Sequence, residues 1–240
     1  MEKRAMLYEG KAKQLFETTE PNILWVQYKD ALTAFNGEKK EQAKGKGRLN
    51  NEISSLLFKQ LSKAGISNHF VKRMSETEQL VKKTSIIPIE VVIRNVAAGS
   101  LARRLGLEEG IPLNTTIAEY YYKDDDLGDP LINEDHIKFL NLVSSNQLNE
   151  MKEIALRVNR HLTKYFKACD VELVDFKLEF GFDKEGELIL SDEISPDTCR
   201  LWDVHTNEKL DKDVFREGIG QVDQAYETIL TRLKGAVVND

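Results

Sequence analysis

Two lysines near the N-terminus could hold one anion between them. Lys11 and Lys13 flank Ala12 in the string Gly10-Lys11-Ala12-Lys13, which we place inside a strand. Residues two apart on a strand point the same way, so both ammonium groups would face one target, and Gly10 would let the backbone come close. A triphosphate is one such target. The alternative is a pair of lysines on the wet face of an edge strand, because a motif this short often occurs by chance.

A second pattern combines charge with the periodicity of a strand. Within residues 174–180, Asp175, Lys177 and Glu179 alternate with apolar residues, so the three charges share one face and the opposite face is core. An ordinary hairpin with one wet face would show the same alternation. The pattern therefore predicts the strand, and leaves the task of its charges open.

Asp192 ends the strand that returns from this one. A loop of two or four residues would place Asp192 on the same face as Glu179, whereas an odd loop would spoil that register. Paired carboxylates at a strand end suit Mg²⁺, which takes one or two carboxylates together with phosphate oxygens and water. An even loop therefore predicts a magnesium site here.

Arg94 precedes a run of small residues, and we expect a helix to begin at Ser100 or Leu101. A helix N-terminus with an arginine nearby can bind an anion. The alternative is a strand-to-helix turn with a solvent-facing arginine. Residues 191–203, which include Arg200, are rich in polar groups without periodicity, and loops of this kind often carry function.

The elements that would position these residues do not alternate regularly, which favours an α+β fold with two lobes, 1–84 and 85–240. Between Gly37 and Arg48 we expect a solvated loop or a mobile lid, and Asn50 or Asn51 is the expected cap of the next helix. Strands are expected at 8–16, 23–28, 70–74, 79–83, 90–94 and twice within 171–192, and helices at about 50–64, 148–166 and from Asp211 or Asp213 through Leu233.

Composition narrows the class of protein. The chain has 240 residues, a net charge of −6 and 31% charged residues, as expected for a globular protein in water. Its acidic pI of about 5.4 argues against general nucleic-acid binding, and no apolar stretch is long enough to predict a membrane span. Cys169 and Cys199 form neither a CxxC pair nor a disulfide framework, so we expect a reducing, cytoplasmic location.

Taken together and in order, these motifs resemble the phosphoribosylaminoimidazole-succinocarboxamide synthase (SAICAR synthetase) family over essentially the whole chain. The resemblance implies an antiparallel N-terminal β lobe like that of protein kinases and ATP-grasp enzymes, a larger mixed C-terminal lobe, and ATP in the cleft. It also implies a carbon-nitrogen ligase of purine biosynthesis that uses ATP and Mg²⁺. The enzyme would join the carboxylate of carboxyaminoimidazole ribotide (CAIR) to the amine of L-aspartate through an acyl phosphate, giving SAICAR, ADP and phosphate. The strings that carry the resemblance are residues 8–13, 80–83, 93–100, 173–181 and 192–203.

Roles follow from the resemblance, motif by motif. ATP phosphates would meet Lys11, Ala12 and Lys13, and adenine would meet the backbone of Val81, Lys82 and Lys83. Mg²⁺ would be held by Glu179 and Asp192. The ribotide phosphate would be bound by Arg94, Ser100 and Arg200, and the catalytic pair Asp175 and Lys177 would face the imidazole and the reacting carboxylate.

Some positions stay without a role. Many relatives have Asp-Gly where this chain has Asn36-Gly37, which leaves the role of that residue open. Lys123 and Asp129 match family positions near the site, but their task does not follow from the sequence, nor do the residues that seat L-aspartate. The expected partners are small molecules only, with a homodimer as one possible assembly.

Two other classes of function are weighed against the ligase. A small-molecule kinase could use the same lobes and release a phosphorylated product, so aspartate-dependent release of free phosphate separates the two. A regulatory nucleotide-binding module without turnover ranks last, because it would have little use for charges on both sides of a phosphate site.

Overall fold

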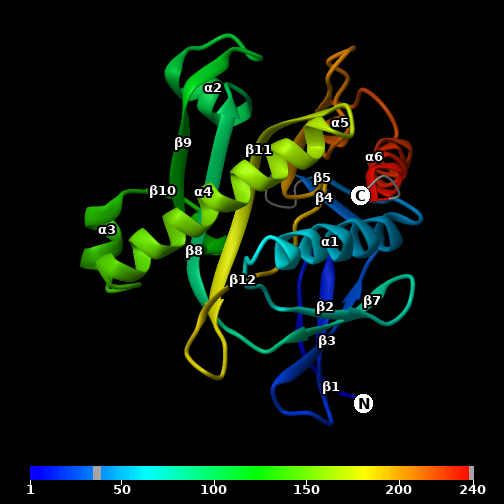
Figure 1. Cartoon of the computed structure of the whole chain (residues 1–240), viewed down its shortest axis with the longest axis vertical. Coiled ribbons are helices and arrows are strands. Elements are labelled where there is room, and N and C mark those ends of the chain that lie inside the picture. Colours follow the sequence, from blue (N-terminus) through cyan, green and yellow to red (C-terminus); the bar gives the residue numbers. More distant parts are fainter. Residues whose placement is uncertain (35–38, 238–240) are drawn as a thin grey trace.

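The computed structural model describes residues 1–34 and 39–237, so Asn36-Gly37 lies outside the described residues (Figure 1). The N-terminal part forms an antiparallel sheet in the order β1-β2-β3-β7-β6. Its strands are β1 Lys3–Glu9, β2 Lys13–Thr18, β3 Ile23–Tyr28, β6 Phe70–Arg73 and β7 Glu78–Lys82. A separate pair, β4 Ala31–Ala34 and β5 Lys39–Gln42, precedes helix α1 Lys46–Lys63, which packs on this sheet.

A second antiparallel sheet begins at Ser85, directly after the first one ends. Its path is β10-β9-β8-β11-β12, and β13 pairs with the part of β11 that β12 leaves free. The strands are β8 Ser85–Val96, β9 Pro112–Tyr122, β10 Leu131–Ile132, β11 Val171–Phe182, β12 Leu188–Ser191 and β13 Cys199–Asp203. The long central strands β8 and β11 carry Arg94, Asp175, Lys177 and Glu179.

One long helix covers a face of this sheet, and the last helix packs on the helix of the first sheet. The long helix α4, Ser145–Lys167, crosses β8 and β11, and α6, Val222–Val237, packs against α1 (Figure 1). Shorter helices are α2 Gly99–Leu105, α3 Glu134–Phe139, α5 Asp213–Glu217 and the 3₁₀ turn η2 Asp125–Leu127. The α+β class predicted from the sequence is confirmed.

Helix α4 shows why these residues form a helix. The hydroxyl of Ser144 accepts a hydrogen bond from the N–H of Gln147, and Oε1 of Gln147 accepts one from the N–H of Ser144, so the first turn is capped. A stripe at helical spacing, from Leu148 to Phe166, is fully or almost fully buried in the main core. Each large apolar side chain buried in this way contributes about 1.5 to 3 kcal/mol before entropy is counted.

The start of α1 differs from the prediction, because the helix begins at Lys46 and not near Asn50. Gly45 takes a left-handed backbone (φ 84°) at the cap, and the carboxylate of Asp30 accepts from the N–H groups of Gly45 (3.0 Å) and Gly47 (2.9 Å). The cap is thus supplied from another segment. The expected loop or lid at 37–48 is wrong for residues 39–42 and 46–48, which form β5 and the first turn of α1, whereas residues 43–45 form a turn between them.

Two further boundaries correct the sequence analysis. The predicted strand at 8–16 is two strands, because the chain turns at Gly10, whose N–H donates to the carbonyl of Lys13 (2.8 Å). The closing helix is also divided, since α5 ends at Glu217, Gly218 caps it with φ 68°, and α6 begins only at Val222.

Candidate active site

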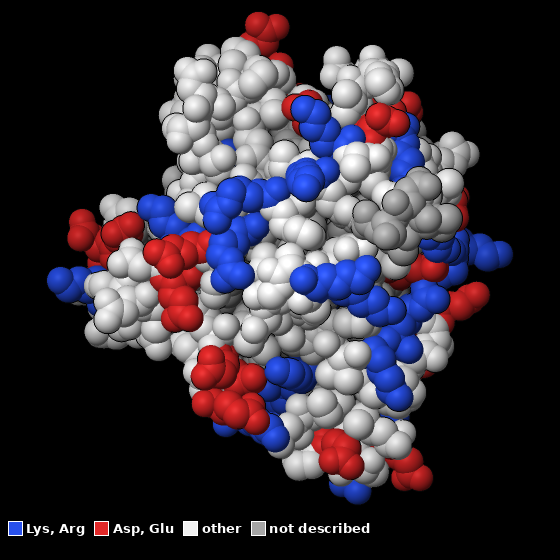
Figure 2. All heavy atoms as spheres, viewed as in Figure 1, with Lys and Arg blue, Asp and Glu red and all other residues white. Residues whose placement is uncertain are grey.

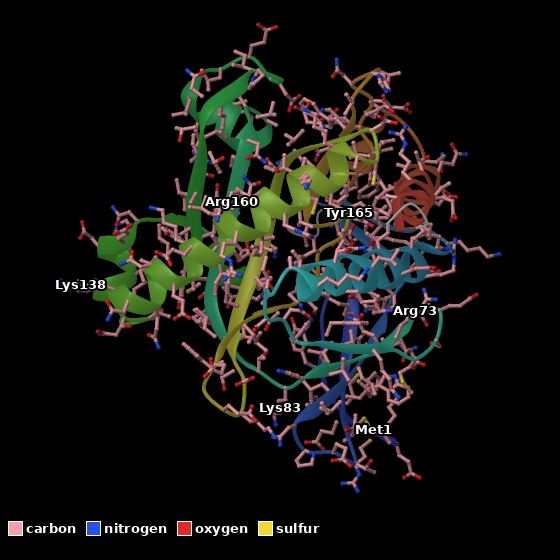
Figure 3. All side chains as sticks on the ribbon, in the orientation of Figure 1. Met1, Arg73, Lys83, Lys138, Arg160 and Tyr165 are labelled. Carbon is pink, nitrogen blue, oxygen red and sulfur yellow. The ribbon has the colours of Figure 1, made fainter. Side chains whose placement is uncertain are left out.

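A cavity of about 820 Å³ is lined by residues of both sheets. It brings together most of the predicted site residues: Lys11, Ala12, Lys13, Val81, Lys82, Arg94, Asp175, Lys177, Glu179, Asp192 and Arg200. Ser100 is not among the lining residues, but its hydroxyl accepts a hydrogen bond from Arg94 (3.0 Å), which lines the cavity. Lys83, which is labelled in Figure 3, is exposed. It is not among the residues that line the cavity.

The two N-terminal lysines face the cavity from different positions. Lys11 lies in the β1–β2 turn, and its ammonium pairs with Asp125 (2.8 Å), where both side chains are largely exposed. Lys13 opens β2 and pairs with Asp192 and with Glu193 (2.9 Å) at a mostly buried position. The single strand face expected for the two lysines is therefore wrong, because a hairpin turn separates them.

An apolar wall continues from these lysines. It is formed by Leu15, Leu24, Val26 and Val81, of which Val26 and Val81 are buried. Beside this wall, the N–H of Lys82 donates to the backbone carbonyl of His69 (2.6 Å), and the N–H of Lys83 donates to that of Asn22 (2.8 Å). Both backbone donors are occupied within the protein.

The centre of the cavity is an alternation of opposite charges. Lys177 donates to Glu90 (2.5 Å) and Glu179 (3.1 Å), and Lys123 donates to the same oxygen of Glu179 (2.5 Å). Burial would lower the pKa of Lys177, but Glu179, Glu90 and Asp192 outweigh it and raise that pKa. Burial also raises the pKa of Glu90, against the opposing effect of Lys177. Lys177 is thus held as an ammonium between carboxylates.

Asp192 reaches the cavity by a route that the sequence analysis did not foresee. Glu179 pairs with Ser191, because the loop between β11 and β12 has the odd number of residues that spoils the expected register. In continued pairing Asp192 would oppose Leu178 and share its core face. Asp192 instead leaves the strand with φ 61°, and its carboxylate lines the cavity.

Nearby cations determine the charge of this carboxylate. Burial would raise the pKa of Asp192, but Lys13, Lys177 and Lys123 hold it well below its usual range. Lysines donate only to Oε1 of Glu179 and to Oδ1 of Asp192. The other oxygen of each carboxylate has no hydrogen bond from the described residues. Both carboxylates therefore keep an oxygen for a hard cation or a polar ligand.

At the far end, Asp175 holds two arginines. Arg94 donates to Asp175 (2.7 Å), Glu119 (2.7 Å), Ser100 and Tyr121, so every nitrogen of its guanidinium has an acceptor. Arg200 binds Asp175 (2.9 Å) through Nη1.

The second partner of Arg200 is Asp213 (2.6 Å), reached through Nε. Nη2 of Arg200 has no hydrogen bond to any described residue, and the guanidinium occupies the space that a Cβ on Gly99 would need. An anion can therefore accept a hydrogen bond from Nη2 without displacing a protein acceptor of Arg200.

Comparison with known proteins identifies the family. The family model described as SAICAR synthetase matches residues 6–233. The chain belongs to this family. It is 60% identical to the phosphoribosylaminoimidazole-succinocarboxamide synthase of Bacillus cytotoxicus over 236 residues, which cover 98% of this chain and 99% of the relative. The predicted carbon-nitrogen ligase of purine biosynthesis is confirmed by this membership.

Solved structures of SAICAR synthetases share the fold. The synthase of Ehrlichia chaffeensis superposes with a TM-score of 0.94 at 45% identity, covering 96% of this chain and 98% of the other. A SAICAR synthetase in complex with ADP gives a TM-score of 0.93 at 47% identity, with 96% and 98% covered. The predicted use of a nucleotide is consistent with that complex.

Several cavity residues were missed or left without a role by the sequence analysis. Glu90 interrupts the apolar residues of β8, and a charged residue inside a buried strand is the signal that could have revealed it. Lys123 and Asp129, which had only their family positions, both line the cavity. The other charged residues of the lining that were missed are Asp125, Glu193, Asp197, Lys212 and Arg216, and His69 lines the cavity as well.

The described residues contain neither a dense cluster of metal ligands nor a helix that could span a membrane. In residues 1–34 and 39–237, no group of three or more His, Cys, Asp or Glu side chains is arranged to hold a metal. A magnesium ion bound mainly by phosphates needs only one or two carboxylates, so this result leaves Glu179 and Asp192 as candidates. In the same ranges no helix is long and apolar enough to cross a membrane.

Proposed function

We propose that this cavity joins the carboxylate of CAIR to the amine of L-aspartate, with ATP cleaved to ADP and phosphate. Family membership and the ADP complex of a 47% identical relative support the reaction. The observation that carries the assignment to this cavity is Lys177, a mostly buried ammonium held by Glu90 and Glu179. Such a charge stabilises a phosphoryl group in transfer. The same cavity is lined by Lys11 and Lys13 and by Arg94 and Arg200.

ATP would lie at the end lined by the first sheet. Its phosphates would meet Lys11, Lys13 and the backbone at Ala12, and its base would pack on the apolar wall beside Val81. Because the N–H groups of Lys82 and Lys83 are already bonded, adenine would be recognised there through carbonyl groups. This proposal includes a β-rich ATP lobe at 1–84 and a substrate lobe at 85–240. It also includes the likeness of the first lobe to protein kinases and ATP-grasp enzymes.

Mg²⁺ would be held by Glu179 and Asp192, which fit it because each keeps an oxygen without a hydrogen bond from the described residues. When bound, the ion neutralises charge on the phosphates and polarises the transferred group. Lys13 and Lys177, which pair with these carboxylates here, would then be free to contact phosphate oxygens.

CAIR would bind with its phosphate at Arg200, Arg94 and Ser100, and with its imidazole towards Asp175 and Lys177. An oxygen of its carboxylate attacks the γ-phosphorus and ADP leaves, which gives an acyl phosphate. The amine of L-aspartate, after losing a proton, attacks the acyl carbon, and phosphate departs with the oxygen that it received. The activated carboxyl has a good leaving group, which a free carboxylate lacks.

Replacing the carboxylates tests this function. Glu179→Gln and Asp192→Asn should each abolish turnover while cooperative unfolding is retained, because each removes a charge assigned to Mg²⁺. Glu172→Gln is the matched control, since Glu172 lies on the same strand but is exposed and outside the cavity lining. Near-normal activity in both site variants would overturn the metal assignment, and loss of folding would indicate that the carboxylates are structural.

A small-molecule kinase is the alternative for the same cavity. It would release a phosphorylated product without L-aspartate, whereas the ligase releases free phosphate only when aspartate is present. The homodimer and the cytoplasmic location stay predictions, which sedimentation and cell fractionation can test.

A further inference from the structure

A groove of about 500 Å³ lies between helix α4 and the second sheet. It is lined by the C-terminal half of α4 and by residues of β8 and β9. Asn95 lines this groove, whereas its neighbour Arg94 lines the active cavity, as expected for consecutive residues of one strand. Since no described residue lines both, the groove is separate from the proposed active site.

Three cations line this groove without an acceptor. Arg160, Lys164 and Lys167 are exposed, and their side chains form no hydrogen bond or ion pair with any described residue. The same half of α4 contains no Asp or Glu, and its fourth cation, Arg157, donates to the carbonyl of Gly65 (3.1 Å). Basic side chains gather over α4 on the face shown in Figure 2, and Figure 3 labels Arg160 there.

These neighbouring charges of one sign destabilise the helix. The spacing puts Arg160 beside Lys164 and Lys164 beside Lys167, so both pairs repel. The helix dipole offsets this repulsion only in the last turn, whereas Arg160 lies about two turns before the end of α4. Burial lowers the pKa of His161, and Lys164 lowers that pKa further. An anion bound in the groove would relieve this excess of positive charge.

The other polar side chains of the groove have already used their donors. The amides of Asn95 and Asn159 bind each other through two hydrogen bonds (2.8 and 2.9 Å), and Asn159 is buried. The hydroxyl of Thr163 donates to Asn159 (3.3 Å), and that of Thr116 donates to Asn95 (3.3 Å). The second N–H of each amide is bonded as well, to Leu173 and to Thr116. Within the described lining, only the three cations therefore keep donors for a ligand.

We propose that Arg160, Lys164 and Lys167 bind the phosphate groups of a small phosphorylated molecule in this groove. A phosphate carries about two charges and three acceptor oxygens on one centre, which suits converging cations. The volume of the groove lies within the range of roughly 300 to 1,000 Å³ that is usual for small-molecule sites. The net charge of −6 argues against a nucleic acid as the ligand. This site goes beyond the proposed function and does not depend on it.

Calorimetric titration of the full chain with inorganic pyrophosphate tests this site. Lys164→Met and Arg160→Gln should each weaken binding in the groove roughly tenfold, as expected for one lost hydrogen bond from a charged group. Pyrophosphate that binds in the active cavity does so in the parent and in both variants, so its contribution cancels in the comparison. Because both side chains are exposed, the variants should fold and should keep the parental turnover when pyrophosphate is absent.

Lys152→Met is the matched control, because it removes the same charge from the same helix. Lys152 is exposed like Lys164, but it does not line the groove, so this variant should bind pyrophosphate as the parent does. Competition with AMP and with ribose 5-phosphate then distinguishes the sources of the phosphate. Displacement of pyrophosphate by both compounds supports recognition of the phosphate alone, and displacement by AMP only supports a nucleotide as the ligand.

Three results would overturn the inference. One is equal affinity for pyrophosphate in the parent, Lys164→Met and Arg160→Gln, and another is displacement of pyrophosphate by neither competitor. The third is binding of single-stranded RNA, or of vesicles of anionic lipid, that Lys164→Met weakens while its pyrophosphate binding equals that of the parent, because the cations would then serve a large anionic surface. None of these results bears on the proposed function, which fails only if no aspartate-dependent product is formed.

Discussion

Arg94 and Arg200 donate hydrogen bonds to the same atom, Oδ2 of Asp175, over 2.7 and 2.9 Å. The two guanidinium groups are thereby held together at the end of the cavity, although they come from β8 and β13. They are not equivalent, since Arg94 is fully engaged with protein acceptors and Arg200 keeps one nitrogen open. Binding of the ribotide phosphate should therefore depend on each arginine in a different way.

Arg200→Lys should weaken CAIR binding by about 1 to 3 kcal/mol, because the lysine keeps the charge but loses the planar fork. ATP affinity and stability should change little. Arg94→Lys should weaken CAIR binding and also lower the melting temperature, since it breaks a buried network. Titration with CAIR and with its nucleoside, which lacks the phosphate, checks both variants. Equal losses for nucleoside and nucleotide would show that the arginines do not read the phosphate.

Gly99→Ala should abolish tight CAIR binding without preventing ATP binding. A Cβ at Gly99 would overlap Nη2 of Arg200, and the backbone there is left-handed (φ 52°). Gly106→Ala separates the two effects, because Gly106 has a similar φ of 63° but open space where the Cβ would lie. Both variants should lose about 1 to 2 kcal/mol of stability. The prediction fails if the two variants bind CAIR equally well.

Lys11→Met and Lys13→Met should both raise the KM for ATP, but only Lys13→Met should destabilise the protein strongly. Removing the ammonium of Lys13 leaves the carboxylates of Asp192 and Glu193 without their shared partner, at a cost of about 3 kcal/mol. The pair of Lys11 with Asp125 is exposed and contributes at most about 1 kcal/mol.

Lys184→Met serves as the control for the two lysines, because Lys184 pairs with Glu185 at an exposed position outside the cavity lining. Chemical unfolding and ATP titration of the three variants distinguish these effects. If CAIR affinity falls while ATP binding is untouched, this end of the cavity has been assigned the wrong ligand.

His69 should make stability depend on pH on the acid side. Burial lowers the pKa of His69 to about 4, against the opposing effect of Asp192, whereas the unfolded chain titrates near its usual value of 6.5. The folded state therefore excludes a proton that the unfolded state binds below that pH, and stability is lost as the pH falls from 6.5 towards 4. The loss amounts to about 2 kcal/mol between pH 7 and pH 5.

In His69→Gln this contribution should be absent, because glutamine does not titrate. The difference in unfolding free energy between parent and variant, measured at both pH values, should therefore shift in favour of the variant at pH 5. A difference that does not change with pH would mean that His69 takes up its proton in the folded protein as readily as in the unfolded chain.

What could be predicted from the sequence is what depends on neighbouring residues. The alternation in β11 correctly places Asp175, Lys177 and Glu179 on one face, and the apolar stripe of α4 correctly predicts that helix. The family could be predicted because several short motifs occur together along the chain in one order, and the family model matches residues 6–233.

What failed depends on contacts between distant segments. The cap of α1 comes from Asp30, and Asp192 enters the cavity through a left-handed residue after an odd loop, which strand periodicity does not encode. The partner of Glu90 is Lys177 on another strand, so the local sequence can mark Glu90 as unusual but cannot show what it binds. The sequence gives the residues on each strand, but not the charge balance where the sheets meet.

The path of one oxygen atom tests the central claim most directly. CAIR labelled with ¹⁸O in its carboxylate is incubated with the protein, ATP, Mg²⁺ and L-aspartate, and the released phosphate is analysed by mass spectrometry. An acyl phosphate predicts that each phosphate carries one carboxylate oxygen and that no phosphate is released without aspartate. Unlabelled phosphate, formed while SAICAR accumulates, would contradict activation of the carboxylate by phosphoryl transfer in this cavity.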